Sequence, residues 1–109
     1  MEKRTAHYNL VAVQAAIAVN GVACFTLSAL RGGHAMGLTS DEMLAVIALL
    51  KRSNLSKSMT TVHDHRVWQD VYHAATPMGP AYVKFTLLPT DTTQKNDMTQ
   101  KFVISFKEL

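Results

Sequence analysis

The sequence predicts an α+β fold in which helices from the first half of the chain cover one face of a small antiparallel β-sheet. Apolar residues in the first half recur at helical spacing, which is typical of amphipathic helices. In the second half, side chains alternate in short stretches joined by hairpin-sized links, which is typical of antiparallel strands. No internal repeat or linker divides the 109 residues, so we expect a single domain, 1–109.

Apolar spacing predicts the first helix, and a turn signal predicts where it ends. Leu10, Val13 and Ile17 share one helical face, and the Asn-Gly pair at 20–21 supplies a stop. We expect residues 22–25 to be a short extended segment.

Two further helices are expected before the sheet. The second should begin near residues 26–28 and end before the two glycines at 32–33. Thr39 and Glu42 have the form of a capping box, in which a hydroxyl and a carboxylate three residues apart satisfy the first turn. The third helix follows this box and is expected to end near residues 53–54.

The second half changes to strand character. Turns are expected at 63–65 and 76–80, and the polar stretch 89–100 is expected to be a surface excursion. Alternating residues between these links predict four strands, over residues 56–62, 66–73, 81–88 and 101–106.

Composition narrows the class of protein. Hydrophobic residues make up 48% and charged residues 17%, which favours a folded chain over a disordered one. The net charge of +3 leans weakly toward an anionic partner. The single cysteine, Cys24, cannot form an internal disulfide and is expected to be buried. The apolar stretch 10–19 is too short for a membrane span and fits a signal peptide poorly, so we expect a cytoplasmic protein.

Strand periodicity places four polar side chains on one face of the expected sheet. Tyr82 and Lys84 share a strand face, and Lys57 and Gln69 can join them from neighbouring strands. The opposite face can bury Phe85 beneath the helices. The sequence therefore predicts an open polar face and a covered apolar face.

This polar set suits RNA cleavage by the ribose 2′-hydroxyl. The reaction needs a proton acceptor, a proton donor and cations that stabilise the charge of the phosphorane. Lys57 and Lys84 would supply charge, Tyr82 would move a proton or stack on a base, and Gln69 would bind a phosphate or base edge. From the spacing alone, ordinary polar residues on a solvated sheet face remain the simpler interpretation.

The histidines do not predict a metal site. His63 and His65 have the His-x-His spacing that can bind zinc, but the chain lacks the cysteines and ordered spacing of a strong zinc motif. His7, His65 or His73 could instead serve as an acid or base, since histidine titrates near neutrality. Each of them alone is more simply a surface residue. We also find no phosphate-cradling glycine loop and no nucleophile elbow.

Several sequence blocks together resemble a known family. They are the start at 1–10, Lys57-Ser-Met-Thr-Thr, the block 64–72 with Trp-Gln-Asp-Val-Tyr, Tyr82-Val-Lys84, and the tail 103–108. In this order and spacing they resemble the motility quorum-sensing regulator (MqsR) toxins, nearly from end to end. Ala6 departs from the proline common in such starts, and 89–100 is longer than in the shortest members.

The resemblance implies a RelE-like mRNA interferase. Such toxins cleave single-stranded mRNA at short GC-containing sites without the ribosome, and their active-site lysine, glutamine and tyrosine match Lys57, Gln69 and Tyr82. The implied partner is a cognate antitoxin with a zinc-binding part and a helix-turn-helix domain. The zinc would belong to the antitoxin, so we expect no metal or cofactor in this chain.

Supporting roles and two rival functions complete the prediction. Lys84 is expected to be a secondary phosphate contact, and His7, His65 and Arg66 are outer candidates for substrate binding. One rival is a non-catalytic regulator that binds DNA or protein, although no helix-turn-helix pattern with exposed basic residues is evident. The other is a RelE-like toxin that has lost activity or cuts only on the ribosome.

Overall fold

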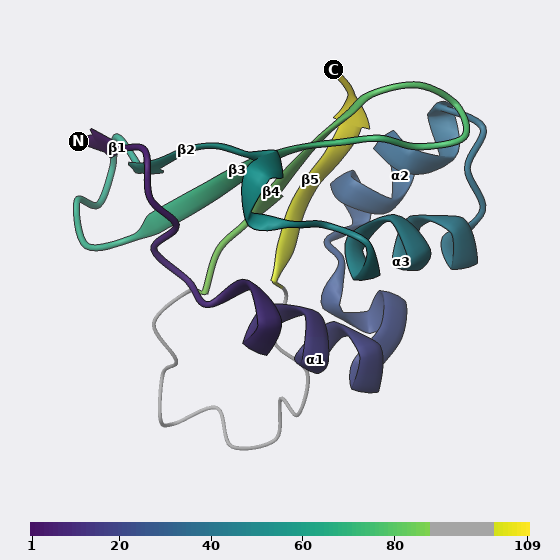
Figure 1. Ribbon diagram of the computed structural model, residues 1–109, viewed down its shortest axis with the longest axis horizontal. Helices are drawn as coiled ribbons and strands as arrows, with labels where there is room; N and C mark the ends of the chain where they lie inside the picture. Colours follow the sequence, from purple (N-terminus) through teal and green to yellow (C-terminus); the bar gives the residue numbers. More distant parts are fainter. Residues whose placement is uncertain (88–101) are drawn as a thin grey trace.

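The computed structural model describes residues 1–87 and 102–109 and confirms the predicted α+β architecture. A layer of helices lies on one face of an antiparallel sheet with the strand order β1-β2-β3-β4-β5 (Figure 1). The helices are α1 (Leu10–Asn20), η1 (Gly21–Cys24, 3-10), α2 (Leu27–Ala35), α3 (Ser40–Ala48) and η2 (Arg52–Asn54, 3-10). The strands are β1 (Glu2–Lys3), β2 (Leu55–Thr60), β3 (Trp68–Ala74), β4 (Ala81–Phe85) and β5 (Val103–Glu108).

Helix α1 follows the prediction, whereas the segment after it does not. The Asn9 side chain accepts a hydrogen bond from the Ala12 N–H at the start of α1, and Gly21 ends the helix with a φ of 63°. The expected extended segment 22–25 is wrong, because the chain tightens into the 3-10 helix η1. Only Phe25 is extended enough to form a bridge, which pairs it in parallel with Val103.

Helix α2 runs through both glycines, so its expected end before them is wrong. The helix continues to Ala35. Because the two glycines have no side chains, the helix can lie close to β5 and α3. A Cβ at Gly32 would lie 2.0 Å from the carbonyl oxygen of Phe106 on β5, and one at Gly33 would overlap Met43 on α3. These glycines therefore mark close packing and not a helix stop.

Helix α3 has the predicted capping box but is shorter than expected. The Glu42 N–H donates to Thr39 Oγ1, and the Thr39 N–H donates to the Glu42 carboxylate. The helix ends at Ala48, and the separate turn η2 occupies the residues expected to finish it. The Gln14 side chain of α1 satisfies carbonyl groups at this end, since its Nε2 donates to the Ile47 carbonyl oxygen at 2.9 Å and to that of Leu50 at 3.0 Å.

The sheet contains one strand that the pattern did not predict. β1 is only two residues long and pairs with β2 through Glu2 opposite Met59 and Lys3 opposite Ser58. β3 is central, with β2 on one side and β4 on the other. The four predicted strands are present with shifted ends, and the expected excursion 89–100 lies outside the described residues.

The core lies between the helices and the covered face of the sheet. Cys24 is fully buried, as predicted, and the rings of Phe25 and Phe106 stack 6.3 Å apart between the helix layer and β5. Tyr72 and Phe85 pack at 5.5 Å on the same covered face. Within the described residues, no helix is long and apolar enough to cross a membrane.

We predict that Gly32→Ala destabilises the chain although alanine is the better helix former. The added methyl would meet the Phe106 carbonyl at 2.0 Å, so α2 must move away from β5. Overpacking of this kind should lower the free energy of unfolding by about 1–3 kcal/mol. Urea unfolding followed by circular dichroism measures it, with Ser28→Ala on the exposed side of α2 as the control. Equal or greater stability of Gly32→Ala would contradict this account of the packing.

Candidate active site on the open face of the sheet

The strand register places all four predicted side chains on the face that the helices leave open. Lys57 on β2 lies opposite Val71 on β3, which lies opposite Lys84 on β4, and Lys84 lies opposite Ser105 on β5. Directly opposed residues share a face, so these form one row across the sheet. The two lysines are two strands apart, which separates their Cα atoms by roughly 10 Å.

The residue between the two lysines is buried although it lies on the open face. Val71 is 1% exposed and is not part of the main hydrophobic core. Its neighbours on both sides are Lys57 and Lys84, whose aliphatic stems can cover it while their ammonium groups reach solvent. Burial, and secondarily the charge of Lys107, lowers the pKa of Lys84. The apolar side chain of Val71, which lies between the two lysines, thus reduces the hydration of the Lys84 ammonium group.

Tyr82 is the centre of a second row formed by three strands. His73 on β3 and Lys107 on β5 lie directly opposite Tyr82 on β4. The Nζ of Lys107 lies 5.2 Å from the centre of the Tyr82 ring, and that of Lys84 lies 5.9 Å from it. The His73 ring is 6.5 Å away. The structure therefore surrounds this phenol with two ammonium groups and an imidazole.

Gln69 lies on the same face but at the other end of β3. It is opposite Met59, in a row that also contains Glu2 of β1. Gln69 and His73 are four residues apart along β3, a separation of roughly 13 Å, and Tyr82 lies opposite His73. The structure thus brings together Tyr82 and Lys84 directly, with Lys57 across Val71, while Gln69 lies at the far edge of the group.

A β-bulge determines the side of the sheet on which Lys57 lies. Leu55 is opposite Tyr72 on the covered face, whereas Lys57, two residues on, is opposite Val71 on the open face. The extra residue, Ser56, reverses the alternation between them. The Lys57 ammonium then lies 3.5 Å from the carboxylate of Glu2, and the Lys57 side chain is 38% exposed.

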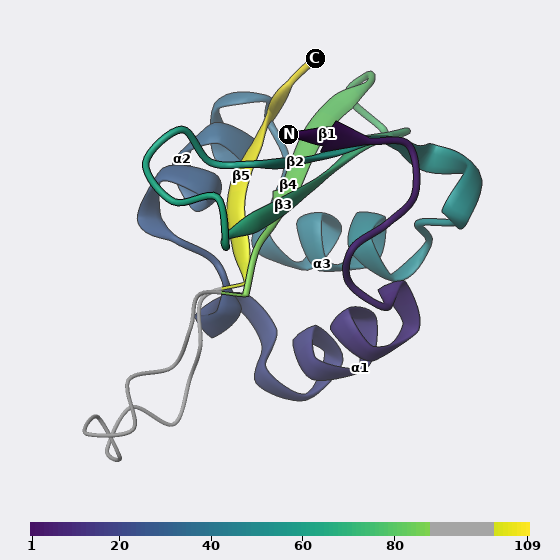
Figure 2. The same ribbon diagram turned by 90° about the vertical axis from the view of Figure 1, so that its left-hand side faces the viewer.

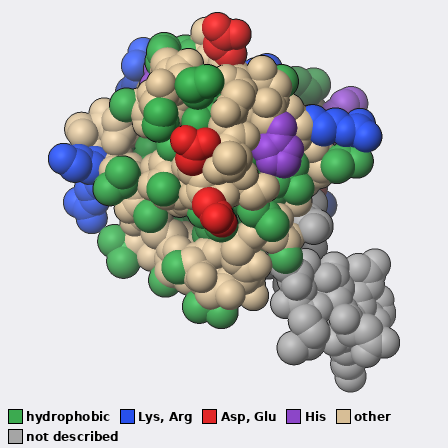
Figure 3. Space-filling model, turned by 90° about the vertical axis from the view of Figure 1, so that its right-hand side faces the viewer, with side chains coloured by type: hydrophobic (Ala, Val, Ile, Leu, Met, Phe, Trp, Pro, Cys, Tyr) green, Lys and Arg blue, Asp and Glu red, His purple; other side chains and the backbone are tan. Residues whose placement is uncertain are grey.

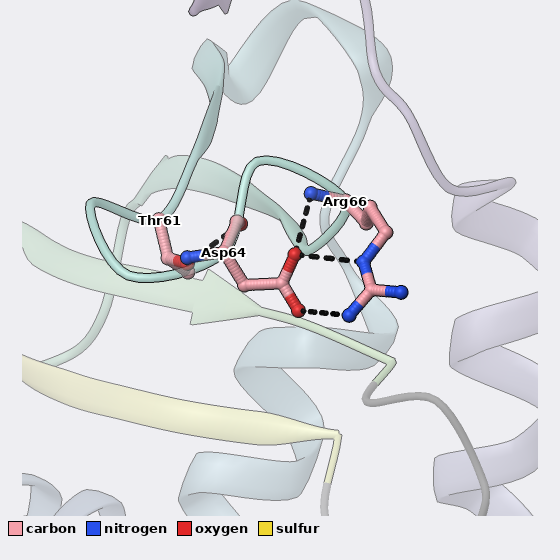
Figure 4. Close-up of polar contacts among 3 residues, drawn as sticks. All are labelled: Thr61, Asp64 and Arg66. Atoms are coloured by element: carbon pink, nitrogen blue, oxygen red, sulfur yellow. Dashed lines mark hydrogen bonds and ion pairs between the residues drawn. The ribbon is translucent and has the colours of Figure 1, made fainter.

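Arg66 and His65 lie in the turn between β2 and β3. Figure 4 shows the turn, in which the guanidinium of Arg66 contacts both carboxylate oxygens of Asp64 at 3.0 and 3.1 Å. The Asp64 N–H also donates to Thr61 Oγ1. Hydrogen bonds from Arg66 lower the pKa of Asp64, and the same pairing raises that of Arg66. Both outer candidates are exposed and lie outside the rows of the sheet.

His7 lies on the covered side, away from the other candidates. Its ring stacks on Trp68 with centroids 5.0 Å apart, and its Nδ1 is 3.1 Å from the ammonium of Lys3. Burial, followed by the charge of Lys3, lowers the pKa of His7, while Asp70 acts in the opposite direction.

The segment that carries His7 is held by a buried carboxylate that the sequence did not single out. Asp70 on β3 is 1% exposed and accepts hydrogen bonds from the backbone N–H groups of His7 and Tyr8 at 3.0 and 2.9 Å. The Tyr8 hydroxyl donates to the Trp68 carbonyl oxygen at 2.9 Å. Together these bonds fix the chain between β1 and α1 against β3.

Metal ligands do not gather in the described part of the chain. Among residues 1–87 and 102–109, no group of three or more His, Cys, Asp or Glu side chains is placed to hold an ion. The open face presents ammonium, phenol, imidazole and amide groups, together with the carboxylate of Glu2.

Comparison with known proteins identifies the family. The family model described as "Motility quorum-sensing regulator, toxin of MqsA" matches residues 5–108. The chain belongs to this family. It is 39% identical over 108 residues to the mRNA interferase toxin MqsR of Escherichia coli strain K12, a match that covers 99% of each chain. The family match spans both the open face and the tethered N-terminal segment.

Sequence reasoning missed three polar residues, two of them on the open face and one, Asp70, on the covered face. Lys107 was missed because the last strand was expected to end at Phe106, whereas β5 continues to Glu108. The alternation of Phe106 inward and Lys107 outward would have revealed it. Glu2 and Asp70 could not be found this way, because their partners are far away in the sequence.

Replacing Asp70 with asparagine should loosen the N-terminal segment. An amide offers one oxygen where the carboxylate accepts two N–H groups, so one buried donor loses its partner. We expect a loss of about 1–3 kcal/mol in the free energy of unfolding and faster hydrogen exchange at the amides of His7 and Tyr8. Asp41→Asn, at an exposed position, is the matched control. Unchanged exchange at both amides would show that Asp70 does not hold the segment.

The pKa of His7 should depend on Lys3. We expect His7 to titrate below its usual 6.5, and Lys3→Gln to raise that pKa because it removes a neighbouring cation. The folded pKa is the lower one, so the stability from neutral His7 is complete above pH 6.5 and is lost as the pH falls through the folded pKa. Ring NMR shifts measured against pH in both chains test this. A His7 pKa that stays the same or falls in Lys3→Gln would refute it.

Proposed function

We propose that the chain is an endoribonuclease toxin that cleaves single-stranded mRNA on the open face of its sheet, in the cytoplasm. The observation that carries this proposal is the register, which aligns Lys57, Lys84 and Tyr82 on a face that no described helix covers. Membership of the MqsR toxin family supports it. So does the relative in Escherichia coli, which is an mRNA interferase toxin.

The cleavage proposed here uses the substrate's own nucleophile. The 2′-oxygen attacks the adjacent phosphorus, the bond to the 5′-oxygen breaks, and the 2′-hydroxyl proton passes to a base while the leaving oxygen gains a proton. Such a displacement requires cations around the phosphorane and groups that move two protons, and it requires no metal.

The open-face residues can meet these requirements. Lys57 would bind the phosphate and stabilise its developing charge, with Lys84 as a second phosphate contact. Tyr82 would transfer a proton or stack on a base, and Lys107 beside its ring adds positive charge at that point. Gln69, at the far end of β3, would orient the RNA that extends beyond the scissile phosphate.

The centre of the helix side offers few cations to the backbone of an RNA strand. Figure 3 shows the helix side, where scattered hydrophobic and acidic side chains occupy the centre and basic side chains lie at the margins. Since phosphate contacts dominate the affinity for nucleic acid, this distribution favours the sheet side.

Two finer features complete the proposal. We expect cleavage at short GC-containing sites, because the family resemblance implies that preference. We also expect a cognate antitoxin, with a zinc-binding part and a helix-turn-helix domain, to neutralise the chain, in keeping with the family description as the toxin of a pair.

Primer extension on a purified transcript, without ribosomes and with EDTA present, tests the proposal. The wild-type chain should cut, and Lys57→Ala should cut about 10²–10³-fold more slowly, because a group that stabilises the transition state is lost. Tyr82→Phe separates the two roles of the phenol: a similar loss indicates proton transfer, whereas retained cleavage indicates stacking. Arg31→Ala on α2 removes a cation elsewhere and should cut normally.

Other outcomes would replace the proposal. A transcript that stays intact alone but is cut during translation would indicate a ribosome-dependent toxin. A transcript that stays intact in both cases, together with a shift of promoter DNA by the chain alone, would indicate a non-catalytic regulator. Circular dichroism of each variant shows whether a loss of activity follows from a loss of fold.

A further inference from the structure

A large cavity lies on the helix-covered side of the sheet, away from the open face. It has a volume of about 860 Å³ and is bounded by the N-terminal segment, the first half of α1 and the turn η2. The two views of the ribbon show the N-terminal segment descending from β1 past the edge of the sheet to α1 (Figures 1 and 2). We call this cavity, defined by the lining described above, the α1 cavity. Its volume lies in the range of small-molecule sites.

The α1 cavity has an apolar floor and a basic rim. Leu50 and Tyr72 are buried at the floor, with the half-buried Leu55 beside them. Arg4, Lys51 and Arg52 also line the cavity, and all three are exposed. No aspartate or glutamate is among the described residues of the lining, and none of the three cations forms an ion pair within the described chain.

Tyr72 contributes a phenol to the lining of the cavity. Tyr72 is 1% exposed, yet within residues 1–87 and 102–109 its hydroxyl makes no hydrogen bond. A tyrosine hydroxyl can donate and accept a hydrogen bond, so this group is available to a ligand in the cavity. Burial, and secondarily the charge of Asp70, raises its pKa to about 12, while the nearby charge of Arg52 acts in the opposite direction. The phenol is therefore a neutral donor that lies near both a carboxylate and a guanidinium.

The walls of the cavity are held by bonds that do not involve a ligand. Gln14 of α1 donates to the Ile47 and Leu50 carbonyls, which fixes α1 relative to the end of α3. Asp70 holds the N-terminal segment on the other side. Just before η2, the Lys51 N–H donates to the Asn54 side chain at 2.8 Å. A preorganised cavity of this kind loses little entropy on binding.

We propose that the α1 cavity binds a nucleoside phosphate, with the base on the apolar floor and the phosphate at the basic rim. Apolar and aromatic side chains suit the faces of a base, and guanidinium groups suit phosphate oxygens. An acidic peptide would use the rim but leave the floor unfilled. The nucleoside phosphate comes from one of two sources, an unpaired nucleotide of an RNA or a free mononucleotide.

Titration of the full-length chain with adenosine 5′-monophosphate, read by ¹H–¹⁵N NMR, tests the site. We expect the amides of Leu10, Leu50 and Leu55 to shift with saturation, and adenosine or inorganic phosphate alone to bind more weakly. Arg52→Gln should weaken binding by about tenfold and Tyr72→Phe by about threefold. Arg31→Gln makes the same change of charge on α2, outside the cavity, and should bind like the wild type.

RNA cleavage then separates the two sources. If Arg52→Gln raises the KM for a long RNA but not for a short one, the occupant is part of an RNA. If neither KM changes while mononucleotide binding weakens, the occupant is a free nucleotide.

Three results would overturn the inference. They are shifts confined to the open face around Lys84, equal effects of Arg52→Gln and Arg31→Gln, and tighter binding of a hexaglutamate peptide than of the mononucleotide. The titration needs no cleavage, so failure of the cavity proposal and failure of the proposed ribonuclease activity can be told apart.

Discussion

The position of β3 at the centre of the sheet is the constraint on which the rest of the molecule depends. Its successive residues alternate between a face covered by helices, where Tyr72 packs on Phe85, and an open face, where Val71 separates two lysines. Because β2 and β4 both pair with β3, a shift of β3 by one residue in this pairing would exchange its covered and open faces. Core packing and the candidate chemistry thus share one register.

The N-terminal segment extends this arrangement beyond the helices. Asp70 belongs to the covered face of β3 but lies where backbone, and not a helix, covers the sheet. A carboxylate can accept several N–H groups at once, so one side chain holds the path of the chain from β1 to α1. This path forms one wall of the α1 cavity and places His7 against Trp68.

Local patterns predicted the fold class, the capping box at Thr39 and the face shared by Lys57, Gln69, Tyr82 and Lys84, because periodicity and caps act within a few residues. The errors have non-local causes. The glycines of α2 resemble a helix stop until the contact with Phe106 is known, and β1 is too short to show a period. The sequence placed Gln69 and Tyr82 together, but only the register shows that roughly 13 Å of strand lies between their rows.

The bulge at Ser56 makes the placement of Leu55 and Lys57 depend on the exact length of β2. Leu55 lines the α1 cavity and Lys57 lies on the open face, and one extra backbone unit between them makes both placements possible. Deleting one residue here would leave the composition almost unchanged, yet it would direct either a leucine into water or a lysine beneath the helices. Relatives should therefore tolerate substitutions at this position more readily than a change in length.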